Sequence, residues 1–136
     1  DLNSIKKMLM RFENLTEATS GVERSEANLE FHFAISRAAG NKYFQAFYDQ
    51  VLIDTIRLAR VCFSDQLSPD ADSVSSLSAH LEETVRQHRL ILAAIEDADA
   101  DTADELAVLH HKLTTERIKK VLFSGVFDDK QLQLGS

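Results

Sequence analysis

Apolar side chains recur every three or four residues along most of the chain, which is the spacing of helices that bury one face. Over the first part of the chain, the positions with this spacing are Ile5, Met8, Leu9, Phe12 and Leu15. The pattern stops at residues 19–21 and then resumes at Leu29, His32, Ile35 and Ala39. We therefore predict a first helix from Asp1 to about Ala18 and a second helix that ends at Gly40, since glycine commonly follows the last turn of a helix.

A third helix is predicted from about Lys42 to Phe63. Its buried side is expected to comprise Phe44, Phe47, Tyr48, Val51, Leu58 and Cys62, widened by Ile53 and Ile56. A helix with so wide an apolar surface is expected to lie centrally in the fold. Residues 64–76 hold the one proline of the chain together with several serines and aspartates, and this composition indicates a loop.

Two more helices are predicted after this loop. The fourth runs from about Leu77 to Glu96, with one apolar stripe formed by Leu81, Val85, His88, Ile91, Leu92 and Ile95. Asp101 is the expected cap of the fifth helix, which runs from about Thr102 to Phe123. Residues 124–136 lose the periodicity and are expected to be a frayed tail. The pattern thus predicts an all-α antiparallel helical bundle over residues 1–123.

The composition agrees with one small helical domain. One proline and four glycines in 136 residues leave few breaks between long helices. No apolar run reaches the ~18 residues of a membrane span, and the single cysteine, Cys62, cannot form an internal disulfide. We therefore expect a soluble, cytoplasmic protein that makes no contact with a membrane. Because the net charge of −7 repels phosphate, any contact with DNA is expected to come from elsewhere.

Three histidines occupy positions where a buried leucine is expected. His32, His88 and His110 each lie on the inward stripe of a different predicted helix. A lone histidine in such a place is usually satisfied by a backbone carbonyl or a water molecule. Three of them on packed helices can instead share a divalent metal ion in a central ligand or metal cavity. Asn28 precedes His32 by one turn, so its side-chain oxygen is expected to face the same space.

The remaining histidines and two arginines leave more than one interpretation open. His80 and His111 lie off the stripes of their helices and are expected to be solvated. On the third helix, Arg57 can pair with Asp54 in a surface ion contact. Alternatively, the guanidinium of Arg57 or Arg60 points into the cavity and binds a carboxylate ligand.

Two segments resemble one family of bacterial regulators. The run from Asn28 to Asn41, with Phe31-His32 and Ala39-Gly40-Asn41, resembles the D-x-x-F-H…A-x-G-N signature of the effector-binding C-terminal domain in the FadR branch of GntR-type transcription regulators. Residues 87–95 are similar to its E-H-x-x-I-x-x-A-I segment. His110 stands where the family has the histidine of its last long helix. The resemblance covers about residues 3–122.

The resemblance implies a ligand-sensing domain that binds a small carboxylate effector, often beside a divalent metal such as zinc or nickel. The family holds this metal through an aspartate and three histidines, which correspond to Asn28, His32, His88 and His110. Asn28 departs from the pattern, and its neutral oxygen is expected to weaken metal binding. The family also implies that an arginine of the third helix, Arg57 or Arg60, helps to hold the effector carboxylate.

The resemblance also implies a homodimer that reaches DNA only through an N-terminal winged-helix domain. That domain and the first helix of the effector domain are expected to be absent from this chain. We expect no enzymatic activity, because a metal-dependent hydrolase would need a general base and Glu30 projects away from the inward stripe. The alternatives are such a hydrolase and a bundle that dimerises without sensing a ligand.

Overall fold

The computed structural model describes residues 2–15, 19–62 and 71–123. Within these ranges the chain forms helices and no strands, which confirms the all-α prediction. The five helices are α1 (Leu2–Glu13), α2 (Gly21–Ala38), α3 (Lys42–Cys62), α4 (Ala71–Glu96) and α5 (Ala100–Phe123). No helix in the described part of the chain is both long enough and apolar enough to cross a membrane.

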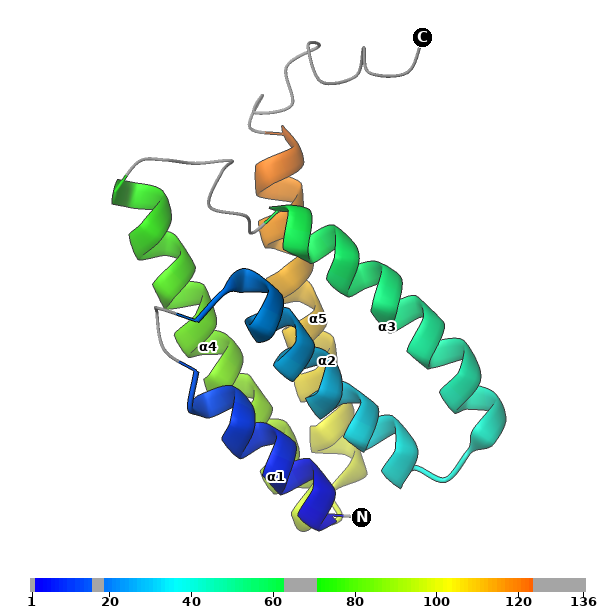
Figure 1. Ribbon diagram of the computed structural model, residues 1–136. Coiled ribbons are helices and arrows are strands. Elements are labelled where there is room, and N and C mark those ends of the chain that lie inside the picture. Colours follow the sequence, from blue (N-terminus) through cyan, green and yellow to red (C-terminus); the bar gives the residue numbers. More distant parts are fainter. Residues whose placement is uncertain (1, 16–18, 63–70, 124–136) are drawn as a thin grey trace, which may run out of the picture.

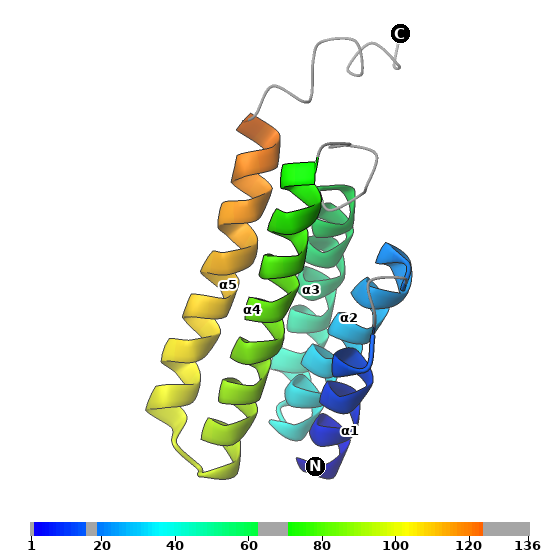
Figure 2. The same cartoon turned by 90° about the vertical axis from the view of Figure 1, so that its left-hand side faces the viewer.

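The helices form a closed ring in the order α1, α2, α3, α5, α4 (Figures 1 and 2). Successive helices run in opposite directions, so α2 and α4 point the same way, as α1, α3 and α5 do. The principal packing partners of α3 are α2 and α5, and those of α4 are α1 and α5. The bundle is therefore antiparallel, as predicted, and its ring of helices encloses an interior that side chains of α2, α4 and α5 can share.

Local capping residues set several helix ends. The Ser20 side chain accepts from the backbone of Glu23, and the Glu23 carboxylate accepts in return from the Ser20 backbone, which is a capping box at the start of α2. Gly40 has a φ of +71°, a left-handed conformation that suits glycine after a helix. Asp99 caps α5, because its carboxylate accepts from the Thr102 backbone N–H at 3.0 Å. The prediction of Asp101 as this cap was wrong, since α5 begins two residues earlier than Thr102.

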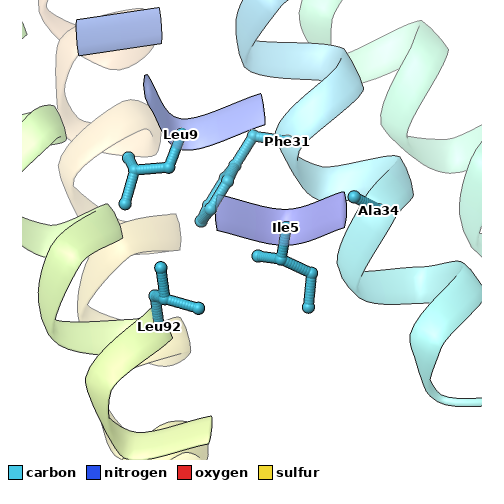
Figure 3. Close-up of a cluster of buried hydrophobic side chains, with 5 residues drawn as sticks. All are labelled: Ile5, Leu9, Phe31, Ala34 and Leu92. Carbon is cyan, nitrogen blue, oxygen red and sulfur yellow. The ribbon is translucent and has the colours of Figure 1, made fainter. Parts of the chain in front are cut away.

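A compact apolar cluster joins α1, α2 and α4 (Figure 3). It consists of the buried side chains of Ile5, Leu9, Phe31, Ala34 and Leu92. Met8 and Ile35 pack against it. Because full burial of a large apolar side chain stabilises the fold by about 1.5–3 kcal/mol, this cluster holds the three helices in a fixed register. The ring of Phe31 also contacts the imidazoles of His32 and His88.

The predicted helix boundaries differ from the structure at two places. Helix α1 ends at Glu13 rather than near Ala18. Helix α4 begins at Ala71, so residues 71–76 are helical although a loop was predicted there. Aspartate and serine are compatible with both interpretations, since they favour the first turn of a helix as well as loops. Phe63 at the predicted end of the third helix, residues 64–70 of the predicted loop and the predicted tail at 124–136 lie outside the described residues.

The predicted buried face of α3 was wrong in part, since Ile56 is buried as expected and the side chain of Cys62 lies outside the described residues. Its buried side chains are Leu52, Ile56 and Ala59. Several predicted core residues are exposed instead, and Phe47 is 72% exposed. The others that are exposed are Phe44, Val51 and Leu58. Helix α3 is apolar on most of its circumference, so periodicity alone could not select the side that packs against α2 and α5.

Candidate functional site

Three imidazoles from three helices meet inside the bundle. His32 comes from α2, His88 from α4 and His110 from α5. The Nε2 atom of His110 lies 3.2 Å from Nε2 of His88 and 3.3 Å from Nε2 of His32. One nitrogen of each ring lies within 4.8 Å of the others, and both His88 and His110 are buried. The structure therefore brings together the three histidines whose positions in the sequence predicted a common centre.

Aromatic rings close one side of this histidine centre. The ring centroid of Phe31 lies 4.3 Å from that of His88, and the centroid of Phe12 lies 5.2 Å from it. The rings of His32 and His110 stack with their centroids 5.2 Å apart. These contacts limit rotation of the imidazoles and exclude water from the buried side of the centre.

Gln87 determines which nitrogen of His110 carries the proton. The Nδ1 atom of His110 lies 3.1 Å from Oε1 of Gln87. The amide nitrogen of Gln87 donates to the Glu83 carboxylate at 2.8 Å, so its oxygen is the atom that faces His110. An amide oxygen only accepts, and Nδ1 of His110 therefore donates to it. This leaves a lone pair on Nε2 of His110, directed at His32 and His88.

Burial keeps all three imidazoles neutral at physiological pH. Desolvation, followed by the proximity of His110, lowers the pKa of His32 to about 3. Desolvation and then the neighbouring His111 lower the pKa of His110 to about 4. The pKa of His88 is also well below its ordinary value, first because of burial and then because of His32 and His110. Neutral imidazoles keep lone pairs available as metal ligands.

The donor atoms fit a divalent metal ion. Zinc binds imidazole nitrogen at about 2.0–2.1 Å, and two such ligands in a tetrahedral arrangement lie about 3.4 Å apart. The two closest Nε2 pairs, at 3.2 and 3.3 Å, are near this value. The side-chain oxygen of Asn28 is buried and makes no hydrogen bond with the described residues. Asn28 lies one turn before His32 on α2, and the three histidines could hold a metal with its oxygen as a fourth donor.

A large cavity opens beside the histidine centre. Its volume is about 1050 Å³, and residues from all five helices line it. His32, His110 and Asn28 are among the lining residues. A space of this size accommodates a metabolite of ordinary dimensions.

The lining of the cavity is positive in a chain that is negative overall. The lining side chains that the structure describes include Arg24, Arg60 and Lys112, and none of them is an aspartate or a glutamate. The chain as a whole has 22 acidic residues against 15 lysines and arginines. An interior with cations and histidines but no carboxylate favours an anionic ligand.

The two arginines proposed from the third helix lie in different places. Arg60 lines the cavity, and its Nε is buried without a hydrogen-bond partner among the described residues. Arg57 lies on the outer surface and contacts the Asp54 carboxylate at 3.5 Å. The surface ion contact that we stated as an alternative is thus the observed environment of Arg57, and only Arg60 reaches the cavity.

The expectation that His80 is solvated was wrong. His80 lines the cavity, and burial, then Arg117 and His110, lower its pKa to about 4. His80 is rotated well off the apolar stripe of α4, but the cavity extends far enough around this helix to include it. His111 is exposed, as expected, and lies at the edge of the same cavity. Gln87 was not among the predicted site residues, although it directly precedes His88 in the segment that resembles the family motif.

These features define a helical bundle with a histidine-lined cavity. The family model for the FCD domain matches residues 1–112. The chain therefore belongs to the FCD domain family, the effector-binding C-terminal domains of GntR/FadR-type transcription regulators. Comparisons with curated proteins and with solved structures gave no match.

Proposed function

We propose that this domain senses a small carboxylate metabolite at a divalent metal held by Asn28, His32, His88 and His110. The observation that carries the proposal is the convergence of three neutral imidazoles on one point beside a cavity. Zinc and nickel are the metals that suit three imidazole nitrogens and one oxygen. When bound, such an ion supplies positive charge that attracts a carboxylate.

The protein's own residues select the ligand. Arg60 contributes a guanidinium to the cavity wall, and a guanidinium binds a carboxylate through paired hydrogen bonds. Leu52 and Ile56 line the cavity on α3, so they contact the apolar part of the ligand. The neutral oxygen of Asn28 gives the metal less charge compensation than an aspartate would. An anionic effector supplies the missing negative charge, so metal and effector should bind cooperatively.

Ligand binding controls DNA binding through the packing of the helices. The cavity is lined by α2, α3, α4 and α5, and a ligand that contacts them favours one arrangement over another. In the complete cytoplasmic regulator, this arrangement sets the separation of two DNA-binding domains across a homodimer. The helical bundle itself does not suit contact with DNA phosphates, because the net charge of the chain is −7.

Sensing is better supported than catalysis. FCD domains belong to regulatory proteins. A metal-dependent hydrolase requires a general base near the ion, and no carboxylate is found among the described residues that line the cavity. Dimerisation alone does not require a cavity of about 1050 Å³ lined by arginines and histidines.

The proposal is tested with the purified domain, first stripped with a chelator and then reloaded. Isothermal titration calorimetry with zinc and with nickel should give one binding site per chain. Native mass spectrometry should report the metal, any retained metabolite and the homodimer together. A thermal-shift screen of small carboxylic acids should find ligands that stabilise the metal-loaded protein by more than about 2 °C and the chelated protein less. The absence of both metal binding and any acid-dependent shift would overturn the proposal in favour of a non-sensing bundle.

A further inference from the structure

The cavity has a second polar end, at a distance from the histidine centre. On α2, Arg24 precedes His32 by eight residues, and on α4, His80 precedes His88 by the same number. Eight residues of helix correspond to a rise of about 12 Å. Helices α2 and α4 run in the same direction, so Arg24 and His80 are displaced from the histidine centre toward the same end of the bundle (Figures 1 and 2). Both residues line the cavity.

Arg60 reaches this end from a third helix. It lies in the last turn of α3, and α3 ends at the end of the bundle where α2 and α4 begin (Figure 1). Side chains lean toward the N-terminus of their helix, so Arg24 and His80 extend toward this end whereas Arg60 extends back into the bundle. Its buried Nε has no hydrogen-bond partner among the described residues. A buried N–H group of a guanidinium is costly to leave unsatisfied, which indicates that a ligand supplies the acceptor.

The wall between the two ends is apolar on α3. Leu52 and Ile56 lie two turns and one turn before Arg60, and both line the cavity. The cavity thus has a metal-binding end, an apolar middle and a cationic end. Acidic side chains do not line it anywhere within the described part of the chain. A ligand with one acidic group can place that group at only one of these two ends.

We propose that the effector carries two anionic groups joined by an apolar stretch, one bound at the histidine centre and the other bound by Arg24 and Arg60. This inference rests on the proposed function and names the chemical class of its ligand. The backbone rise between the two ends is about 12 Å, and each anion lies about 3 Å from the groups that bind it, which leaves about 6 Å between the two acidic groups. Linear dicarboxylates of intermediate length, such as adipate and suberate, have this span.

The test compares ligands that differ in one charge. Calorimetric titration of the metal-loaded domain uses adipate, suberate, monomethyl adipate and the shorter succinate. Adipate or suberate should bind about ten-fold more tightly than monomethyl adipate, because the ester lacks the second charge-assisted contact. Succinate should bind no more tightly than the ester, since it is too short to reach both ends. Equal affinities for the diacids and the ester would overturn the inference, and failure of every acid to bind would overturn the proposed function with it.

Variants then locate the second anionic group. Arg60→Gln and, separately, Arg24→Gln should each reduce the affinity for adipate several-fold more than they reduce the affinity for monomethyl adipate. Arg57→Gln is the matched control, because Arg57 lies on the same helix as Arg60 but faces solvent beside Asp54. It should change neither affinity. An equal loss of affinity for both ligands in the arginine variants would show that these residues do not contact a second acidic group. Far-UV circular dichroism reports whether each variant is folded. If one of the two arginine variants does not fold, the other still tests the inference.

Discussion

Gln87 and His110 form a buried contact in which the amide oxygen of one lies 3.1 Å from Nδ1 of the other. The partner of the Gln87 amide nitrogen is Glu83, which in turn contacts Arg86 at 2.6 Å on the surface. A chain of hydrogen bonds therefore runs from an exposed ion pair to the histidine centre. It holds His110 in the tautomer whose free lone pair faces His32 and His88.

Replacement of Gln87 by methionine should weaken metal binding without unfolding the domain. Methionine fills a similar volume but offers no acceptor to Nδ1 of His110, so the imidazole loses its fixed tautomer and orientation. Loss of such an outer partner typically lowers metal affinity about 10–100-fold. Calorimetric titration with zinc measures the effect. Gln50→Met is the control, because Gln50 is exposed on α3 and contacts only Asp54 among the described residues. Equal zinc affinity in the two variants would contradict the role of Gln87.

Replacement of His88 by alanine should abolish metal binding and retain the helical fold. His88 is fully buried and supplies one of the three converging nitrogens, and two imidazoles with one amide oxygen do not complete a tight site. Elemental analysis after reloading with zinc reports the occupancy, and circular dichroism reports the fold. His111→Ala removes a neighbouring imidazole that is exposed, and it should bind metal like the unmodified domain. Full occupancy in His88→Ala would show that the ligand set is wrong.

Replacement of Asn28 by aspartate should tighten metal binding. The Asn28 oxygen is buried without a partner, and a carboxylate in its place adds a negative charge next to the cation. We expect at least about a ten-fold gain in zinc affinity, equivalent to about 1.4 kcal/mol. Asn41→Asp adds the same charge at an exposed cap, where the side chain accepts from the Phe44 backbone, and should leave zinc affinity unchanged. An unchanged affinity in Asn28→Asp would mean that Asn28 does not face the ion.

The sequence was sufficient to predict the histidine centre because helical periodicity fixes which side of a helix a residue occupies. His32, His88 and His110 lie on apolar stripes that pack together, so their convergence follows from the stripes alone. The position of Asn28, one turn before His32, follows from the same geometry.

The remaining features depend on tertiary packing, which the periodicity of the sequence does not determine. His80 faces the interior because the cavity is wide, and width depends on how far apart the helices lie. Arg57 and Arg60 are separated by less than one turn, and α3 has apolar residues on both sides of them. The choice between the two arginines therefore required knowledge of which side of α3 contacts α2 and α5.

The metal-free domain should lose stability as the pH falls from about 7 to 5. The pKa of His32 is lowered from 6.5 to about 3, and those of His80 and His110 are lowered to about 4. Below pH 6.5 the unfolded chain therefore binds protons that the folded chain does not bind, so the free energy of unfolding decreases as the pH falls toward the folded-state values. Each histidine contributes at most about 1.4 kcal/mol per pH unit in this window.

Urea unfolding of chelated protein at pH 7.5, 6.5, 5.5 and 5.0 measures this dependence. Carboxylates with lowered pKa values, such as Glu83 with a pKa of about 2, act in the same direction but below about pH 4.5, outside the measured range. The variant His32→Ala removes one titrating group, so its free energy of unfolding should depend less steeply on pH. A free energy of unfolding that stays constant or rises between pH 7.5 and 5.0 would contradict the burial of neutral histidines. Saturation with zinc should raise the free energy of unfolding by a similar amount across this range, because the imidazoles of the folded domain carry no protons that the metal must displace.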